Sequence, residues 1–575
     1  MIMFLLFMDP LHNFIVRELR TIQKDVKWFI HDFTYTDGAQ ANEARLVNIA
    51  QGPVRGYKEQ NDTLFAFYGI PYATAPTGDD KFKAPLPPPQ WTEPFEAVNK
   101  YVVCPQIVYM SLGIDLIQQE DCLIANIYVP DTEEKNLPVV VHVHGGAYQV
   151  GYGNLMTAKQ LIKDKNIIIV NFNYRLGAHG FLCLGTEDVP GNAGMKDQVA
   201  LFRWVKENIA SFGGNPDDVT INGFSAGSSS VDLHLVSPMT KGLFNKVIPE
   251  SGASLSVFSV QTDPVENAWK YAKMLNYTNE NNDIYDLEFF YKSASYETLT
   301  SINILNEPDS TFYFVPCVER EQGEERFLDD APLKILKSGR NHKLPMLFGF
   351  AEMEGLFRVP LFETWFSKMN ENFADFLPGD LKFSNLKEKE EVAQRIKEFY
   401  FGKKPVSKET IFRYIDYFTD VIFAYGTLKS VQLQVESGNK DIYLYEYSFV
   451  DDNVPLVPHT FVRGANHCAQ SMAVGDGFFL NAETETIDFI NMKQVMRKLW
   501  YNFITTGKPV AEGSDLPTWP PTDANGGPHM SLDKTMKLRG PLIQQRFLFW
   551  DAIYDKYYAM PTAPAPPRPK TKTKL

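Results

Sequence analysis

The middle of the chain alternates short apolar runs with stretches of helical periodicity, and this alternation is the feature that most constrains its fold. The apolar runs span residues 139–144, 167–172, 219–223, 246–250, 344–350 and 442–447. Strands that are separated by helices pair in parallel, because each helix carries the chain back across the sheet. The sequence therefore predicts an α/β fold, with a large, mostly parallel sheet and helices on both faces.

Most of the chain is expected to form one domain, and a segment at each end differs from it in composition. The domain spans residues 36–558, and a chain of 575 residues with 44% hydrophobic content can bury a large core. Within residues 1–35, an apolar stripe faces a basic one over residues 11–30, which predicts an amphipathic helix. Residues 559–575 are rich in proline and end in a basic run, so we expect a disordered tail.

Charge and hydropathy exclude several classes of protein. The formal net charge of −14 provides no basic field that could bind nucleic acid. No run of about 18 apolar residues occurs, so no spanning helix is expected.

The apolar residues 1–8 lack a preceding basic residue and a following cleavage site, which argues against a signal peptide and favours an intracellular protein. Residues 11–30 would then lie on a membrane surface or pack on the domain. The oligomeric state cannot be inferred from these features.

No metal or cofactor site is indicated. The five cysteines include no Cys-x-x-Cys pair, which argues against zinc and redox sites. Their odd, low number does not suggest a scaffold held by disulfides. His142 and His144 share one face of a predicted strand, but no third ligand accompanies them. We therefore expect neither a metal nor a cofactor.

The first chemical motif is Gly223-Phe224-Ser225-Ala226-Gly227, between the predicted strand 219–223 and a helix-compatible segment at 231–236. At a strand-to-helix turn, a Gly-x-Ser-x-Gly sequence forms a nucleophile elbow. Its glycines leave room for the tight turn, and the helix directs its N-terminal amides towards the reaction centre. We therefore expect Ser225 to be a nucleophile; a chance match is the alternative.

A second motif, Gly145-Gly146-Ala147, follows the predicted strand 139–144. A glycine pair lets backbone N–H groups approach a substrate oxygen closely, as an oxyanion hole requires. The alternative is an ordinary glycine turn.

A serine nucleophile needs a histidine base and an acid, and at nucleophile elbows the acid precedes the histidine in the chain. His467 lies in a glycine-containing loop before an apolar helical stretch. The other histidines after Ser225 lie in less suitable helical, strand-flanking or proline-bound contexts: His234, His342, His459 and His529. The predicted strand 344–350 ends near Glu352 and Glu354. Carboxylates at this edge of a parallel sheet lie where ligands bind, so both glutamates are candidates.

Further segments accompany these motifs in a fixed order. They are Gly69-Ile70-Pro71-Tyr72-Ala73, Glu120-Asp121-Cys122-Leu123, Asn173-Tyr174-Arg175-Leu176-Gly177, Gly191-Asn192-Ala193-Gly194, Asp197-Gln198, Phe212-Gly213-Gly214-Asn215-Pro216 and Gly464-x-x-His467. From residue 69 to 467 the chain resembles the type-B carboxylesterase/cholinesterase family, most closely its insect carboxylesterases. The resemblance implies an α/β-hydrolase fold for residues 36–558, with a deep gorge over the nucleophile.

The resemblance assigns the catalytic roles residue by residue. It makes Ser225 the nucleophile, His467 the base and Glu354 the acid, because a glycine follows the acid in the family pattern. It implies a serine carboxylesterase that works through an acyl-enzyme without a cofactor.

The resemblance also implies the groups around the triad. The amides of Gly146, Ala147 and Ala226 would form the oxyanion hole, and family members more often have glycine at position 147. Cys104 and Cys122 are the expected disulfide candidate.

The chain departs from the family where cationic substrates are recognised. Phe224 replaces the glutamate that usually precedes the nucleophile, and no tryptophan stands between Cys104 and Cys122 to stack on a quaternary ammonium. We therefore expect neutral, largely apolar esters as substrates. A juvenile hormone esterase-like enzyme is one alternative, although the glutamine that many of these enzymes have at position 224 is missing. An esterase that sequesters organophosphates or other xenobiotics is another, and a catalytically inert adhesion protein is the alternative that is not an enzyme.

Two further departures lie near the site. Lys81 replaces an arginine that usually pairs with the equivalent of Glu120, so we expect a Lys81–Glu120 pair without bidentate geometry. Cys468 and Gln470 stand in a region where relatives often carry an acid. The sequence offers no account of this change.

Overall fold

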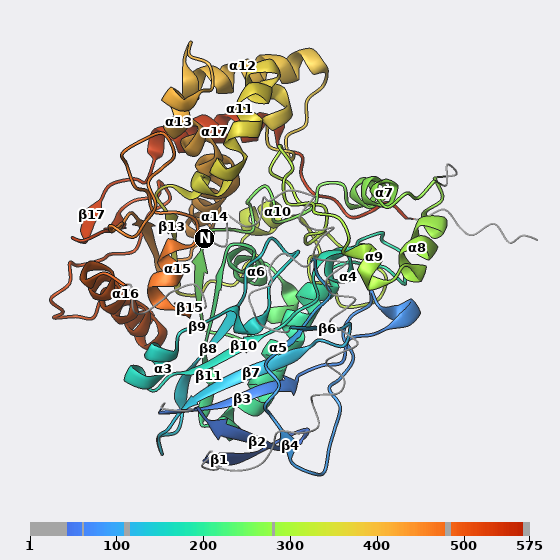
Figure 1. Ribbon diagram of the computed structural model, residues 1–575, viewed down its shortest axis with the longest axis vertical. Coiled ribbons are helices and arrows are strands. Elements are labelled where there is room, and N and C mark those ends of the chain that lie inside the picture. Colours follow the sequence, from blue (N-terminus) through green and yellow to red (C-terminus); the bar gives the residue numbers. More distant parts are fainter. Residues whose placement is uncertain (1–42, 60–62, 108–115, 279–281, 478–484, 567–575) are drawn as a thin grey trace, which may run out of the picture.

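The computed structural model describes residues 43–59, 63–107, 116–278, 282–477 and 485–566 (Figure 1). One large sheet crosses this part of the chain. In spatial order its main strands are β1 (Ala44–Ile49), β2 (Gly52–Lys58), β3 (Leu64–Pro71), β7 (Ile124–Pro130), β10 (Ile168–Phe172), β8 (Leu137–Val143), β11 (Gly214–Phe224), β12 (Lys246–Glu250), β13 (Met346–Ala351), β14 (Ile442–Tyr447), β16 (His529–Leu532) and β17 (Lys537–Arg539).

The centre of the sheet is parallel and its edges are antiparallel. Parallel pairing runs from β10 through β8, β11, β12, β13 and β14 to β16. The N-terminal strands β1, β2, β3 and β7, and the last strand β17, pair antiparallel. Every residue of β10, β12 and β13 is buried, as expected for parallel strands covered on both faces. The six predicted strands are present, and the prediction of a mostly parallel α/β sheet is confirmed.

Helices cover both faces of this sheet and enclose two apolar cores. The larger core includes buried side chains of α5 (Ala193–Asn208), α6 (Ala226–His234) and α14 (Tyr425–Glu436). The other core includes those of α3 (Lys159–Lys165), α15 (Ala469–Val474) and α16 (Ile487–Thr506). A further group gathers at the top of Figure 1: α11 (Phe362–Glu371), α12 (Leu386–Phe401), α13 (Ile411–Phe418) and α17 (Gln544–Tyr557).

The predictions for the two chain ends concern residues 11–30, which the structure does not describe, and residues 559–575, which it describes in part. The amphipathic helix predicted at residues 11–30 lies outside the described residues. Residues 559–566 are described, and they do not form a free tail. Pro561 and Pro564 are buried, and the Ala559 N–H donates to the backbone oxygen of Asp380 at 2.8 Å. The tail prediction is therefore wrong for residues 559–566, because these prolines supply apolar surface that packs on the domain.

Within the described residues, none of the helices is both long and apolar enough to cross a bilayer.

Candidate active site

Ser225 lies in a strained turn between β11 and α6. Its φ of 57° and ψ of −123° are rare for a residue with a side chain, and its N–H donates to the backbone oxygen of Glu250 at 2.8 Å. The flanking glycines are required by space. A Cβ on Gly223 would lie 2.4 Å from the Gly227 oxygen, and one on Gly227 would lie 2.1 Å from the Val143 oxygen. This geometry is that of a nucleophile elbow.

The structure brings Ser225, His467 and Glu354 together from three separate segments. The Ser225 Oγ lies 2.9 Å from Nε2 of His467, whose Nδ1 lies 2.5 Å from Oε2 of Glu354. Glu354 is fully buried and His467 is 8% exposed, so the histidine–carboxylate pair is shielded from water. Glu352, the other acid candidate, is exposed, which leaves Glu354 as the partner of the histidine.

The Glu354 carboxylate is held by groups that the sequence motifs do not reveal. Its Oε1 accepts hydrogen bonds from the Ser251 hydroxyl and, at 2.8 Å, from the Ala351 N–H. The Gln470 side-chain amide in turn donates to the Ser251 hydroxyl at 2.5 Å. Gln470 thus supports the acid indirectly, which accounts for one of the two unexplained departures after the histidine.

The His467 imidazole lies between two phenylalanine rings. Phe423 stacks on it at a centroid distance of 4.3 Å, and Phe357 contacts it edge-on at 5.5 Å. Phe423 belongs to a π-helix, Thr419–Ala424, whose Thr419 hydroxyl also accepts the Gly355 N–H at 2.9 Å. The π-helix therefore contacts both the base and the turn that carries the acid, consistent with the frequent occurrence of π-helices at functional sites.

The Gly145-Gly146-Ala147 loop lies against the elbow, since a Cβ on Gly145 would lie 2.6 Å from the Phe224 oxygen. Gly146 has φ 116° and Ala147 has φ 57°, and a Cβ on Gly146 would lie 1.9 Å from the Val150 oxygen. Among the described residues, neither the Gly146 nor the Ala147 N–H donates to another protein group. Ala226 is the first residue of α6, so its N–H has no acceptor within the helix. All three amides are thus available to a substrate oxygen.

Tyr174 supports this loop. The Tyr174 hydroxyl donates to the His144 backbone oxygen at 3.0 Å, and its ring stacks on the His144 ring at 4.4 Å. His144 itself contacts the Gly145 oxygen through Nδ1 at 2.8 Å. These contacts explain why a tyrosine follows β10 in the Asn173-Tyr174-Arg175 segment.

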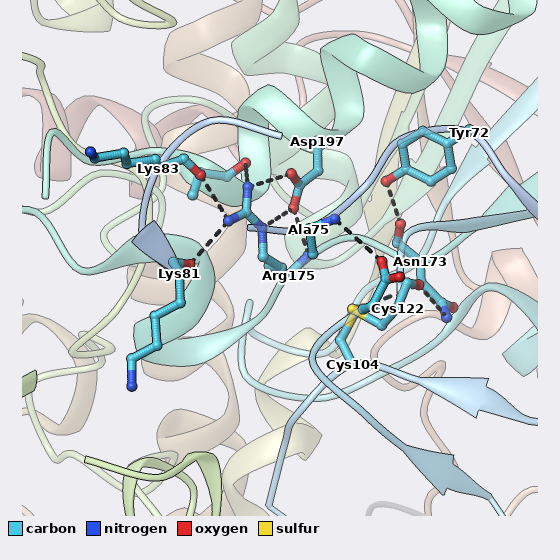
Figure 2. A network of polar contacts seen from close by, with 11 residues as sticks. Tyr72, Ala75, Lys81, Lys83, Cys104, Cys122, Asn173, Arg175 and Asp197 are labelled. Atoms are coloured by element: carbon cyan, nitrogen blue, oxygen red, sulfur yellow. Dashed lines mark hydrogen bonds and ion pairs between the residues drawn. A yellow bond between two sulfur atoms is a disulfide. The ribbon is translucent and has the colours of Figure 1, made fainter. Parts of the chain in front are cut away.

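Arg175 anchors the neighbouring segments through a buried network (Figure 2). Its guanidinium donates to both carboxylate oxygens of Asp197, at 2.8 and 2.6 Å, and to the backbone oxygens of Lys81 and Lys83, at 3.1 and 2.8 Å. In the same view the Tyr72 hydroxyl donates to the Asn173 oxygen at 2.7 Å. These hydrogen bonds attach the N-terminal loop, the segment from Tyr72 to Lys83, to Asn173 and Arg175, which follow β10.

Glu120 does not pair with Lys81 as predicted. Its carboxylate lies 3.4 Å from Nε2 of His179, and hydrogen bonding to this histidine lowers the pKa of Glu120. Lys81 donates instead to the Ala294 backbone oxygen, and burial lowers its pKa. The shorter reach and single-point geometry of lysine account for this exchange of partners.

The remaining predicted residues have structural partners. Phe224 is half-buried and stacks on His142 at 5.7 Å, and the His142 Nδ1 lies 2.7 Å from the Asn222 side-chain oxygen. The histidines not chosen as base contact other groups: His234 contacts Gln198, His342 the Ser237 oxygen, His459 Glu363 and His529 the Gly540 oxygen. Within the described part of the chain, no group of three or more histidine, cysteine or acidic side chains is arranged to hold a metal ion.

Four of the five cysteines form disulfides. The expected pair, Cys104–Cys122, is present, and a second bridge joins Cys183 to Cys317 across 134 residues. Cys468 is free. The expectation drawn from the low, odd count is therefore wrong, because it did not anticipate a pair that only the fold brings together.

The chain is similar to several esterases. A model of the carboxylesterase family matches residues 43–550. The chain is 34% identical to "Esterase FE4" of Myzus persicae, covering 84% of this chain and 88% of the relative, and 32% identical to "Juvenile hormone esterase" of Tribolium castaneum, covering 81% and 84%. The crystal structure of juvenile hormone esterase from Manduca sexta, with OTFP covalently attached, matches with a TM-score of 0.79 and 30% identity, covering 89% of this chain and all of that one. The chain therefore belongs to the carboxylesterase family, as a carboxylic ester hydrolase with an α/β-hydrolase fold.

Proposed function

We propose that the protein hydrolyses neutral carboxylic esters with largely apolar acyl or alcohol groups, with Ser225 as the nucleophile. The observation that carries this proposal is the continuous contact from the Ser225 Oγ through the His467 ring to the Glu354 carboxylate. A serine in this setting can be deprotonated as it attacks, because the buried carboxylate stabilises the imidazolium that forms.

The reaction proceeds in two matched steps. Nε2 of His467 takes the Ser225 proton while Oγ attacks the ester carbonyl, and the same proton then passes to the leaving alcohol. This leaves an acyl group on Ser225. Water repeats the sequence, with His467 as its base, and releases the carboxylic acid. In both steps the amides of Gly146, Ala147 and Ala226 donate to the oxyanion, and one such donor contributes roughly 3–4 kcal/mol.

The preference for neutral substrates rests on the residue that precedes the nucleophile. Phe224 presents an aromatic ring stacked on His142, where many relatives carry a carboxylate. No tryptophan between Cys104 and Cys122 supplies a face for a quaternary ammonium. Without these two features a choline headgroup meets neither a counter-charge nor an indole face at this place.

A panel of esters tests the substrate class. Specificity constants are measured for p-nitrophenyl esters of increasing acyl length, for acetylthiocholine and for juvenile hormone, whose esterases are among the relatives. We expect kcat/KM for acetylthiocholine to be at least about tenfold below that of a neutral acetyl ester. Equal or higher efficiency with the choline ester would contradict the proposal. Juvenile hormone as the best substrate of the panel would favour the hormone esterase alternative, and titration with an organophosphate followed by recovery of activity would identify a slow, sequestering enzyme.

We further propose that the chain folds in an oxidising compartment. The two disulfides support this, since such bridges persist in the endoplasmic reticulum lumen and outside the cell but rarely in the cytosol. The expected intracellular location then fits only an oxidising lumen.

The sequon Asn276-Tyr277-Thr278 follows α7 (Pro264–Met274), and Asn276 and Thr278 are exposed. Mass spectrometry of the native protein should find both bridges and a glycan on Asn276. Reduced cysteines and a bare asparagine would contradict this location.

Residues 11–30 are the proposed membrane contact. Their opposed apolar and basic stripes suit a helix that lies in the plane of an anionic surface. The test compares the full chain with a variant lacking residues 1–35 in co-sedimentation with anionic liposomes at low salt. Equal, weak binding of both proteins would show that this segment does not bind membranes.

A further inference from the structure

A second buried carboxyl group, that of Glu250, lies directly behind the nucleophile. Glu250 ends β12, is 2% exposed, and pairs in register with Phe224 of β11. Its backbone oxygen accepts the Ser225 N–H at 2.8 Å. The next residue, Ser251, donates to Glu354. Glu250 therefore lies between the nucleophile and the acid, yet the reaction described above does not use its side chain.

The hydrogen bonds of this carboxyl are incomplete. The Asn222 side-chain amide donates to Oε2 at 2.8 Å, and the Asn222 oxygen is in turn contacted by His142. The Ser471 hydroxyl, on α15, lies beside the carboxyl. Neither Oε1 of Glu250 nor Oγ of Ser471 has another partner among the described residues. A proton on Oε1 would give both atoms a partner at once.

Among the described residues no positively charged group pairs with this carboxyl. The titratable groups near it are Cys468, the N-cap residue of α15, Tyr445 of β14 and, through Asn222, His142 of β8. Glu354 is a neighbour of the same cysteine and tyrosine. Burial raises the pKa of Cys468 and Tyr445 and lowers that of His142, which keeps all three neutral. A carboxylate at Glu250 would thus be a buried charge without compensation.

The environment therefore favours the protonated form of Glu250. Burial raises the pKa of Glu250 to about 8, although the polar side chains of Asn222 and Ser471 beside it lower it. Carboxylic acids kept neutral in this way can act as hydrogen-bond donors.

We propose that Glu250 is a positioning residue that works as a neutral acid: its O–H donates to Ser471, and its loss of the proton in alkaline solution lowers the activity of the enzyme. The link to the chemistry runs through α15. Ser471 follows Gln470, which donates to Ser251, which in turn donates to Glu354. An ionised Glu250 has no proton to donate and draws Ser471 and Asn222 towards its charge. The helix that supports the acid is then no longer held in place.

The pH profile of kcat/KM distinguishes this role from a merely structural one. Between about pH 7 and pH 8 the base is neutral and Glu250 is still protonated, so we expect the highest kcat/KM of the wild-type enzyme in this range. Above it, we expect kcat/KM for a neutral p-nitrophenyl ester to fall at least about threefold by about pH 9.5. Glu250→Gln cannot ionise, but it keeps an oxygen for Asn222 and an N–H for Ser471. This variant should retain the wild-type activity at neutral pH and show no alkaline decline.

Two further variants complete the experiment. Glu250→Met is also neutral but can neither donate nor accept, so we expect kcat reduced about threefold to tenfold at every pH, unchanged KM and no alkaline decline. Asp380→Asn removes a different buried acid whose pKa burial raises to about 7, and this control should keep the wild-type profile. Titration of active sites with an organophosphate expresses all rates per folded site, and it shows separately whether the wild-type protein is an active serine esterase.

An alkaline decline that persists in either neutral variant would overturn the proposal, as would a wild-type profile that stays flat. A folded Glu250→Gln variant that is inactive at every pH would also overturn it, because a neutral replacement should suffice. If one variant fails to fold, the other still decides the question, since both lack the ionisable group.

Discussion

At the scale of single residues, the site depends on backbone conformations that side chains rarely adopt. Ser225 and Ala147 both have a φ of 57°, and Gly146 has φ 116°. Such conformations cost of order 1–3 kcal/mol for residues other than glycine and persist only where the surroundings enforce them. Here these conformations occur at the nucleophile and in the loop that would form the oxyanion hole. The strain is therefore part of how the site is built.

Ser225→Ala should abolish ester hydrolysis while the fold survives. The methyl group fits the space of the hydroxymethyl group, and only the nucleophilic oxygen is lost. We expect p-nitrophenyl ester turnover to fall about 10⁴-fold or more, with an unchanged melting temperature. Turnover of the purified, folded variant near the wild-type rate would show that another group is the nucleophile.

Ala147→Gly should broaden the range of acyl groups without loss of activity. The N–H that faces the oxyanion remains, the methyl group is removed, and the positive φ no longer costs about 1 kcal/mol. We expect kcat/KM for a bulky acyl ester, divided by that for the acetyl ester, to rise severalfold. An unchanged ratio would mean that the Ala147 methyl group does not contact the acyl chain.

Ser225 could be chosen from the sequence because it lies in an elbow motif that follows an apolar strand, whereas the choice of Glu354 over Glu352, and of His467 as the base, came from the family resemblance. The residues that hold the triad could not be chosen in either way. Ser251, Gln470 and Phe423 belong to no motif with a chemical meaning, and their roles follow only from the packing of β12, α15 and the π-helix around the triad. Side chains that act through another side chain leave no periodic or compositional signal.

At the scale of elements, buried polar pairs connect segments that lie far apart in the sequence. Arg175 follows β10, whereas its partner Asp197 lies in α5 and the carbonyls that it binds belong to Lys81 and Lys83 (Figure 2). These contacts join the N-terminal loop to the catalytic side of the sheet. The pair is almost fully buried, so either charge alone would be left without compensation.

Asp197→Ala should therefore destabilise the protein strongly. Removing one partner of a buried ion pair costs about 3–5 kcal/mol, because the remaining charge stays buried. Glu325→Ala breaks an exposed pair with Arg203 and should cost less than about 1 kcal/mol. Urea unfolding of both variants measures the difference, and equal losses would contradict the structural role of Arg175.

Asp380 should make stability depend on pH. It is buried and accepts a hydrogen bond from the Tyr554 hydroxyl of α17 at 2.9 Å, and burial raises its pKa to about 7, against about 3.9 in an unfolded chain. Between these values the folded state holds a proton that the unfolded chain has released. Its stabilising contribution is thus complete below about pH 4 and is lost as the pH rises through about 7.

Asp380→Asn keeps an acceptor for Tyr554 but cannot ionise. Relative to the wild type, its free energy of unfolding should increase from about pH 4 to about pH 7 and then level off. Thermal unfolding at several pH values measures this difference, and a constant difference across the range would contradict the buried, protonated acid.

At the scale of the whole molecule, the disulfides restrict the unfolded chain to different extents. Cys183 and Cys317 are 134 residues apart, whereas Cys104 and Cys122 are separated by only 18. The loss of chain entropy is larger for the longer loop, and removing a native bridge typically costs about 2–5 kcal/mol. Replacing Cys183 and Cys317 by serine should thus lower the free energy of unfolding more than the same change at Cys104 and Cys122. The opposite order would mean that local packing determines these energies.

The overall architecture could be predicted because buried parallel strands appear in the sequence as continuous apolar runs, such as that of β10. The end of the domain could not. Residues 559–566 have the composition of a disordered segment, yet Pro561 and Pro564 are buried against it. Likewise, the Cys183–Cys317 bridge depends on a distance in space that no local pattern encodes. Composition predicts whether a segment would be ordered in isolation. It does not predict contacts that depend on the surface of another part of the fold.

The chain order of the triad also affects how the enzyme is made. Ser225 precedes His467 by 242 residues. At about 5–20 residues per second, the ribosome takes about 10–50 s to add the histidine after the serine. During that interval β8, β11 and β12 have all been synthesised, so the elbow has its neighbours while its base does not yet exist. A nascent chain thus cannot hydrolyse esters while its base is missing, and activity begins only when the last quarter of the chain has been synthesised and folds onto the sheet.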